Sequence, residues 1–345
     1  MKKIHLIREK HTPYGGAENY LSRLMSALQE RGVDCEVLNS PFPSFLPSWM
    51  RMFLFDKFLC WNKKNKFYFS LERISCPDIY RAGDGVHKVF LEKTNKKSFN
   101  PLHRVMKYYE KKCFSSARVI VANSQMVKSE IIQTYGISSK NIKVIYNGIP
   151  VKSCDYYYSY KKIYKEFSYI DSKKIILFVG SGFSRKGVDS FLKIISLLKT
   201  IGVIAFVIGY DKNINKYIDT SSNLGLRDIV NFIGPRDDVN DFYCISDFVI
   251  LPSLYDPFSN VTLEAMNFGN VVFTSHGNGA SELLDPEYVF RQGNEAEVSS
   301  KIKDLIKDDE NLNSIKENNI NIARRFSIQR NMKQTLQLIT KHIYD

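Results

Sequence analysis

The sequence has few glycines and prolines, no long uncharged apolar run and no motif for a metal. Its 345 residues include only 18 Gly and 11 Pro, which excludes a collagenous or low-complexity chain. The best candidate for a membrane span, residues 201–210, is long enough only for a buried strand. The first nine residues lack the apolar centre of a secretory signal peptide. We therefore expect a cytoplasmic protein that does not span the membrane.

Cysteine and histidine are equally scattered. The six cysteines show no C-x-x-C spacing, so in a chain of this size we expect them to be reduced, buried thiols. The six histidines show no H-E-x-x-H or other ligand spacing, and we expect no metal site. The cysteines are Cys35, Cys60, Cys76, Cys113, Cys154 and Cys244.

The net charge of +13 lies entirely in the first half of the chain. Residues 1–150 carry 25 basic and 12 acidic side chains, whereas residues 151–345 carry 24 of each. Such an uneven distribution suggests that the first half faces an anionic partner, either a membrane surface or a nucleic acid.

Short β-branched runs alternate with longer amphipathic stretches along most of the chain, which predicts repeated βα units and parallel sheets. The tyrosine-rich segment 152–170 interrupts this pattern, and we interpret it as an inter-domain segment, although a short amphipathic helix fits too. We expect two doubly wound α/β domains, residues 1–165 and 166–325. The predicted strands are 3–7, 34–38, 118–122, 142–145, 174–179, 203–208, 230–233, 248–251 and 270–274, and the predicted helices are 16–31, 124–135, 188–200, 239–246, 260–268 and the region from 295 onward.

Two glycine-containing loops follow predicted strands, where open α/β sheets bind ligands. Gly15 and Gly16 let backbone amides approach an anion at a helix start, or simply form a tight turn. In the second half, Gly182 and Gly187 have P-loop spacing, but the Lys-Ser/Thr pair of a Walker ATPase is missing. Arg185 and Lys186 in this loop suit a diphosphate clamp, or a merely solvated basic loop.

The most specific segment runs from Leu251 to Met266. Asp256 ends a loop after a strand, and Glu264 follows eight residues later in a helix expected to begin near Asn260. The amides at that helix start would point at a phosphate, and Glu264 would accept hydroxyl hydrogen bonds one turn further on.

Together these segments resemble the retaining glycosyltransferases of family 4. The run from Asp256 to Glu264 is similar to the E-x7-E signature of that family, and the matching segments cover most of residues 4–284 in order. Residues 180–189 are similar to the lipopolysaccharide core glucosyltransferases of Gram-negative bacteria. The other matching segments are Tyr14–Glu18, Val121–Ser124, Tyr146–Ile149, Phe232–Gly234, Asp247–Ser253 and Gly269–Glu282.

The resemblance implies two Rossmann-like domains facing a central cleft, the glycosyltransferase B-type fold. It implies that the second domain holds the nucleotide-sugar, the first holds the acceptor, and a last helix at about 326–345 crosses back to the first domain. Arg185 and Lys186 would stabilise the leaving diphosphate, and Asp256 would touch the donor sugar. The residues implied to bind the donor are Gly15, Gly16, Gly182, Arg185, Lys186, Arg236, Phe258, Ser259, Asn260, Val261 and Glu264.

Four positions bear on the sugar: Asp256, Ser181, Asp84 and His87. Asp256 stands where the family usually has Glu, and Ser181 stands where many members have Arg, so Arg185 would have to do more. Asp84 and His87 fall where family members place acidic or His groups beside the reacting sugar, although a lone His is often a structural residue.

The resemblance implies a retaining, metal-independent hexosyltransferase. We expect it to move a hexose, glucose first, from a UDP-sugar to a lipid-linked or phosphorylated glycan, the lipopolysaccharide core first. It would work at the cytoplasmic face of the inner membrane. Sibling enzymes using UDP-galactose, UDP-N-acetylhexosamine or GDP-mannose, for capsule, O-antigen or another glycan, remain open. A basic nucleic-acid-binding protein is a remote alternative, because no nucleic-acid-binding motif is present.

Aromatic and basic residues are mixed in the segments 42–69 and 88–112. Such mixtures suit docking to an anionic membrane at least as well as RNA binding. A core helix flanked by solvated lysines is the third interpretation.

Overall fold

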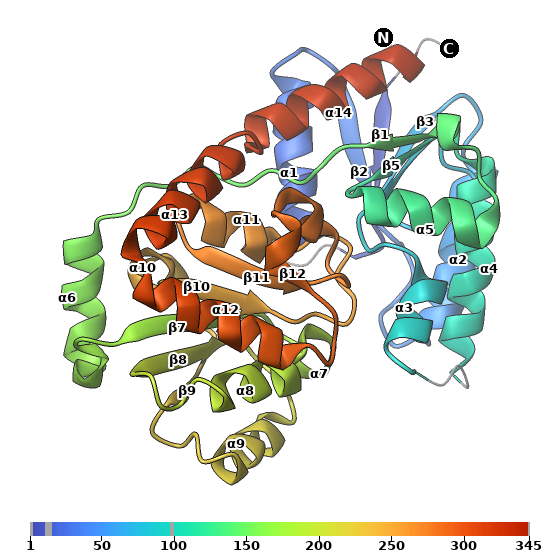
Figure 1. Ribbon diagram of the computed structural model, residues 1–345. Helices are drawn as coiled ribbons and strands as arrows, with labels where there is room; N and C mark the ends of the chain where they lie inside the picture. Colours follow the sequence, from blue (N-terminus) through green and yellow to red (C-terminus); the bar gives the residue numbers. More distant parts are fainter. Residues whose placement is uncertain (1–2, 11–15, 97–99, 344–345) are drawn as a thin grey trace. The chain divides into compact units, whose positions relative to one another are not determined.

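The computed structural model describes residues 3–10, 16–96 and 100–343 (Figure 1). Its contacts divide the chain into two compact units, which we describe separately: unit 1, residues 1–147 with 328–345, and unit 2, residues 148–327. Each unit is built on one parallel six-stranded sheet, which confirms the predicted fold class. No helix among the described residues has the length and apolar character needed to cross a membrane.

In unit 1 the strand order is β2-β1-β3-β4-β5-β6, and every neighbouring pair is parallel. The elements of unit 1 are β1 (Ile4–Ile7), α1 (Gly16–Gln29), β2 (Cys35–Leu38), α2 (Ser48–Trp61), β3 (Phe67–Ser70), β4 (Ile79–Ala82), α3 (His87–Lys93), α4 (Pro101–Ser116), β5 (Val119–Ala122), α5 (Gln125–Tyr135), β6 (Ile142–Val144) and α14 (Ile328–Ile343). The hydroxyl of Ser124 accepts a hydrogen bond from a backbone amide in the first turn of α5, and Gly136 ends that helix with φ 67°. The sequence predicts both residues as the ends of the helix.

The last helix of the chain belongs to the core of unit 1. Leu336 and Ile339 of α14 lie in one hydrophobic cluster with Leu24 of α1. The hydroxyls of Tyr20 and Thr335 lie 3.2 Å apart inside the same contact. Lys333 and Lys341 of the same helix are exposed, so α14 is amphipathic.

In unit 2 the strand order is β12-β11-β10-β7-β8-β9, again parallel throughout. The elements of unit 2 are α6 (Tyr156–Glu166), β7 (Lys174–Val179), α7 (Phe183–Lys186), α8 (Val188–Ser196), β8 (Val203–Ile208), α9 (Ile214–Asn223), β9 (Val230–Gly234), α10 (Val239–Ile245), β10 (Phe248–Leu251), α11 (Asn260–Asn267), β11 (Val271–Ser275), β12 (Val289–Phe290), α12 (Glu295–Lys307) and α13 (Asp309–Ala323). All six residues of β8 are buried, which explains why the β-branched runs predict these strands so well.

The tyrosine-rich segment is a helix of unit 2. Asp155 caps α6, and Lys162 on that helix donates to Asp241 of α10 over 2.6 Å. The contacts of the chain change from one unit to the other after Asn147, whereas we expected the boundary after residue 165. The physical reason is this packing of α6 on α10, which a count of tyrosines and lysines does not reveal.

The basic and aromatic segment 42–69 contains both an exposed helix and a buried strand. Residues Phe67–Ser70 form β3 in the middle of the sheet and are fully buried. Helix α2 buries Phe55 and Leu59 but exposes much of its other face. The exposed aromatic residues are Phe45, Trp49, Phe53, Phe58 and Trp61.

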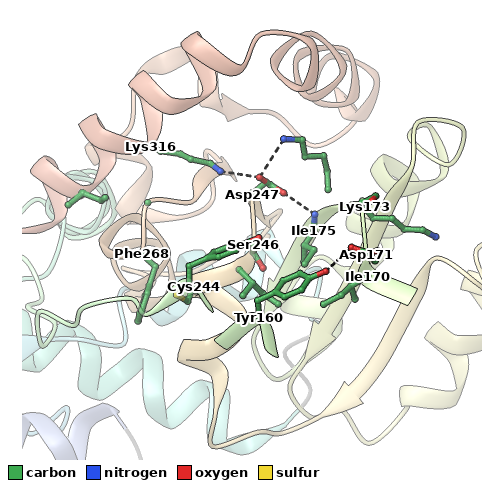
Figure 2. Close-up of a pocket in the computed structure, with 16 residues that line it drawn as sticks. Tyr160, Ile170, Asp171, Lys173, Ile175, Cys244, Ser246, Asp247, Phe268 and Lys316 are labelled. Carbon is green, nitrogen blue, oxygen red and sulfur yellow. Dashed lines mark hydrogen bonds and ion pairs between the residues drawn. The ribbon is translucent and has the colours of Figure 1, made fainter. Parts of the chain in front are cut away.

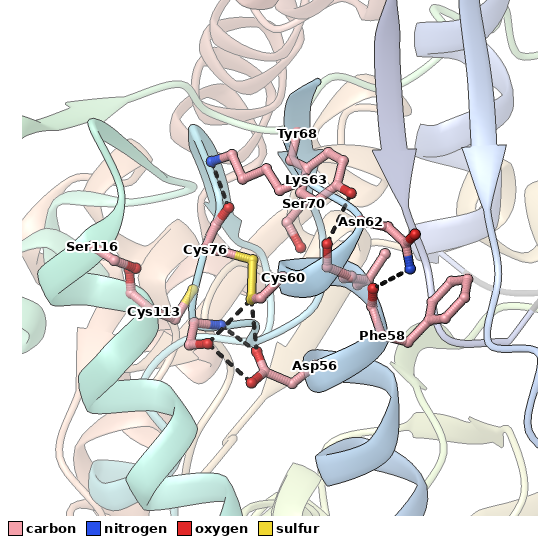
Figure 3. The surroundings of a disulfide bond; sticks show 12 residues. Asp56, Phe58, Cys60, Asn62, Lys63, Tyr68, Ser70, Cys76, Cys113 and Ser116 are labelled. Carbon is pink, nitrogen blue, oxygen red and sulfur yellow. Dashed lines mark hydrogen bonds between the residues drawn. A yellow bond between two sulfur atoms is a disulfide. The ribbon is translucent and has the colours of Figure 1, made fainter. Parts of the chain in front are cut away.

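Four of the six cysteines are paired as disulfides, so the expectation of six reduced thiols is wrong for this structure. Cys60 is bonded to Cys76 in unit 1 and Cys154 to Cys244 in unit 2, while Cys35 and Cys113 are free. Figure 3 shows the first pair between the end of α2 and the loop after β3. The pairs are 16 and 90 residues apart, so no short spacing motif could identify them.

Candidate active site

The glycine loop of unit 2 joins β7 to α8 through the short helix α7. Gly182 and Gly187 flank α7 with φ values of 76° and 81°, a conformation that favours glycine. A β-carbon at Gly187 would collide with the carbonyl oxygen of Pro252 after β10. The amide of Gly182 donates to the Tyr210 carbonyl and that of Phe183 to Asp211. These two amides are therefore already engaged, and contact of the loop's two cations with a ligand stays a prediction.

Arg185 and Lys186 converge on Asp256, the predicted acidic residue of the loop after β10. Lys186 Nζ lies 2.5 Å from Asp256 Oδ2, and Arg185 Nη1 lies 3.9 Å from the same oxygen. Lys186 and Asp256 are buried, whereas the Arg185 side chain is 35% exposed. Two cations beside one carboxylate leave an excess positive charge at this end of the sheet.

Helix α11 begins next to these charges. Ser259 precedes it, and Phe258, Ser259, Asn260 and Val261 form its entry as predicted. The Ser259 amide donates to Asn278 Oδ1, and the Ser259 hydroxyl is buried without a hydrogen-bond partner among the described residues. A helix start with an orphaned hydroxyl is chemically suited to an anion.

Asn278 is a positioning residue that the sequence did not single out. Its side chain accepts from the amide of Ser259 and donates to the hydroxyls of Thr262 and Thr274. It thus ties the start of α11 to the end of β11. Its position in the segment 269–282 is the one signal that could have indicated it.

Glu264 lines a cavity of about 280 Å³ within unit 2, together with Val179 at the end of β7, Lys152 and Tyr243. Tyr243 is fully buried and donates its hydroxyl to Glu264 Oε2 over 3.3 Å. Burial, together with the Glu264 carboxylate, raises the pKa of Tyr243 well above its usual value, so the hydroxyl keeps its proton. The Glu264 carboxylate is held in place while it faces the cavity.

Arg236 lies after β9 and makes ion pairs within unit 2. Its guanidinium donates to both carboxylate oxygens of Glu166 on α6 and to both of Asp238. These bonds raise the pKa of Arg236 and lower that of Asp238. Contact of Arg236 with a donor stays a prediction.

In unit 1, Gly16, Asp84 and His87 follow strands at the carboxyl edge of the sheet. Gly16 begins α1 and is exposed, while Gly15 lies outside the described residues. A hollow of about 240 Å³ at this edge is lined by residues that include Glu9, Arg51 and Glu72. Arg51 donates to Glu9 over 2.9 Å, so this hollow has charged and apolar walls.

Asp84 lies in the loop between β4 and α3, and His87 is the first residue of α3; the two side chains differ in exposure. The Asp84 side chain is 71% exposed and lies 4.0 Å from Arg73. His87 is buried, and its Nε2 lies 3.1 Å from His103 Nδ1. Burial, reinforced by Arg73, lowers the pKa of His87 to about 4, so the ring is neutral at pH 7. Their roles at a reacting sugar stay predictions.

Glu110 of α4 holds this loop and is not among the residues that the sequence predicts. Its side chain is fully buried and accepts from Arg73 Nε, the His87 amide and the Tyr135 hydroxyl over 2.7–3.0 Å. The amide of Lys88 donates to it as well. An acidic residue inside a basic helix shows no sign of this role in the sequence.

Another hollow of unit 2, of about 630 Å³, lies away from the predicted residues. It opens at the amino ends of β7 and β10, where Lys316 and the Ile175 amide both bind Asp247 (Figure 2). Opposite it, the carboxyl ends of the same strands carry the glycine loop and the Asp256 loop. Among the described residues, no three His, Cys, Asp or Glu side chains are arranged to hold a metal ion.

Two protein families match parts of this chain. The family described as Glycosyltransferase Family 4 matches residues 79–153, and Glycosyl transferases group 1 matches residues 159–322. Taken together, the two matches identify the chain as a glycosyltransferase of group 1/family 4. The second match includes the glycine loop, Asp256 and Glu264.

Individual relatives share about 30% identity with this chain, over half of its length or less. An uncharacterized glycosyltransferase, MJ1607 of Methanocaldococcus jannaschii, is 30% identical over 50% of this chain and 46% of its own. The lipopolysaccharide glucosyltransferase WaaG of Escherichia coli is 31% identical over 33% of this chain and 32% of its own. The sequence match thus spans half or less of the length of these two relatives.

Solved structures extend the likeness to the whole fold. The crystal structure of WaaG covers 98% of this chain and 99% of its own with a TM-score of 0.80 and 18% identity. That of HepE from Anabaena, in complex with UDP-glucose, covers 99% and 100% with a TM-score of 0.75 and 19% identity. The fold of this family member is therefore that of these two glycosyltransferases.

Proposed function

We propose that this protein is a retaining hexosyltransferase that takes a hexose, glucose first, from a UDP-sugar. The observation that carries the proposal is the convergence of Arg185 and Lys186 on Asp256 beside the start of α11. Excess positive charge next to a helix start suits a diphosphate, whose two phosphates carry negative charge. The name of WaaG and the UDP-glucose in the HepE complex support a UDP-glucose donor.

Each part of the donor would have its own contact. Glu264, one turn into α11, would accept the ribose hydroxyls in the cavity that it shares with Tyr243. Asp256 would reach the hexose, and Arg185, which is partly exposed, would contact the diphosphate.

The reaction would proceed by attack on the face from which the diphosphate departs. The bond from the anomeric carbon to the diphosphate oxygen breaks, and the acceptor oxygen bonds to the same face of that carbon. The acceptor proton passes to the departing diphosphate. Arg185 and Lys186 stabilise the charge that develops on the leaving group. With two cations in place we propose that no divalent ion is needed; activity that EDTA abolishes and Mg²⁺ restores would contradict this.

The acceptor would be a lipid-linked or phosphorylated glycan, first the lipopolysaccharide core, at the cytoplasmic face of the inner membrane. The basic first half of the chain and the exposed aromatic face of α2 support a site of work at an anionic surface. Both segments named above, 42–69 and 88–112, belong to unit 1, where we propose that the acceptor binds.

A donor panel tests the proposal. Purified protein is incubated with UDP-glucose, UDP-galactose, UDP-N-acetylglucosamine or GDP-mannose, and nucleotide release and thermal shift are measured with and without a lipopolysaccharide core acceptor. We expect UDP-glucose to give the largest shift and acceptor-dependent release. Release from GDP-mannose alone would assign the sibling activity instead, and no shift with any nucleotide-sugar would overturn the donor site.

A further inference from the structure

A basic groove of about 550 Å³ lies at the amino edge of the unit 1 sheet, opposite the Asp84 loop. It is formed where three parallel strands begin: β3 after Lys66, β4 after Asp78 and β5 after Arg118. The polar side chains around it are Lys63, Lys64, Asn65, Lys66, Asp78, Ser116 and Arg118. Four cations face one carboxylate.

The single carboxylate of the groove is already satisfied. Asp78 is buried and accepts from the Tyr68 amide over 2.8 Å. Lys63 Nζ lies 3.1 Å from it and Arg118 Nε 3.4 Å. Lys63 also donates to the Cys76 carbonyl, next to the disulfide (Figure 3). Asp78 therefore pairs with two of the four cations, Lys63 and Arg118, and makes no ion pair with the other two.

Lys64 and Lys66 are the cations that remain. Both are exposed, and neither makes an ion pair with any carboxylate in the part of the chain that the structure describes. Glu36, whose carboxylate is influenced by the charge of Lys66, already pairs with Lys3 and His5. Lys64 has φ 37°, a left-handed conformation that is rare outside glycine and that forms the turn carrying both side chains. The groove thus has the charge to bind an anion.

Aromatic side chains at the end of α2 indicate the source of that anion. Trp61, two residues before Lys63, is 87% exposed, and Phe58, one turn earlier, is 40% exposed. A free anion gains nothing from exposed aromatic rings. At a membrane interface, however, tryptophan lies at the level of the headgroups while lysine attracts anionic lipid.

We propose that this groove holds the phosphate of an anionic lipid headgroup, with Lys64 and Lys66 on the phosphate and Trp61 in the interface. The inference makes specific the membrane contact of the proposed function and is independent of its chemistry. It assigns the membrane contact to the turn after α2, at the edge of the unit 1 sheet that lies opposite the Asp84 loop.

Vesicle co-sedimentation of the full chain tests it. Vesicles of phosphatidylcholine, with and without phosphatidylglycerol, are compared for the unchanged protein, for Lys64→Gln with Lys66→Gln, and for the matched control Lys161→Gln with Lys165→Gln on the exposed face of α6. We expect the first double variant to bind anionic vesicles about thirtyfold more weakly, which is about 2 kcal/mol for two lysines. The control pair should change binding less than threefold.

Two further measurements separate the sources and guard against misfolding. Trp61→Ala should weaken vesicle binding, whereas inorganic phosphate at millimolar concentration should compete only weakly. The lipid site would be overturned if both double variants lost vesicle binding to the same extent. It would also be overturned if the protein bound phosphate and neither Trp61→Ala nor added vesicles changed that binding. The thermal shift by UDP should be unchanged in all variants, so a failure of the donor site would be seen separately.

Discussion

Glu110 in unit 1 and Asp256 in unit 2 are both buried carboxylates that bind a cation, but they differ in what surrounds them. Glu110 has one cation, Arg73, and three uncharged donors, so its group is neutral and complete. Asp256 has two cations within 4 Å, so its group keeps a positive charge. In unit 1 the ion pair holds a loop in place, whereas in unit 2 the excess positive charge is the feature that we propose binds the donor diphosphate.

The largest expected effect is on stability, at Glu110. Glu110→Ala leaves Arg73 buried without its partner, and we expect the free energy of unfolding to fall by about 3–5 kcal/mol. Urea denaturation measures this. Replacing both partners, Arg73→Met with Glu110→Leu, should recover most of the loss. A single variant within about 1 kcal/mol of the unchanged protein would show that the pair does not hold the loop.

A substitution of Lys186 should lower activity, whereas the substitution of Glu110 lowers stability. We expect Lys186→Ala to lower kcat by about 10²–10³, because one cation beside the developing charge is lost. The thermal shift by UDP should vanish with it, whereas Glu110→Ala should keep its shift. Lys193→Ala, an exposed lysine on α8, is the control. Full activity of the Lys186 variant would remove the basis of the comparison.

Glu264 tests the ribose contact. Glu264→Gln should raise the donor KM about tenfold to a hundredfold, since a hydrogen bond to a charged group contributes about 1.5–3 kcal/mol. The kcat should change less. Glu297→Gln, at an exposed position of α12, serves as the matched substitution. An unchanged donor KM would mean that the ribose lies elsewhere.

The smallest effect is the pH dependence from His87. Its folded pKa of about 4 lies below its ordinary value of 6.5, so the unfolded chain binds more protons between these values. The free energy of unfolding should therefore fall as the pH drops from about 6.5 to about 4. His87→Gln should reduce that slope in urea titrations at several pH values. An equal slope in both proteins would assign it to other groups.

The sequence predicts the fold well where burial is uniform. Strands β8 and β10 are fully buried, and their runs of apolar, β-branched residues predict them directly. Ser124 and Gly136 predict the two ends of α5. Strand β3 was missed, because its aromatic residues sit among lysines that belong to the adjacent turn.

The candidate site is predictable only in part. Asp256, Glu264 and the two cations lie near glycines and helix starts, so local patterns indicate them. Glu110 and Tyr243 act through partners 20 or more residues away, and no local pattern records such contacts. The disulfide partners are also distant in the sequence, 16 and 90 residues apart.

The collision that any side chain at Gly187 would make with Pro252 has a consequence for engineering. The glycine loop and the loop carrying Asp256 fit each other through bare backbone, so neither can be redesigned alone. A chimera that imports residues 182–187 from a relative should fold only if residues 252–256 come from the same parent. Donor preference would then be inherited as a pair of segments rather than as single residues.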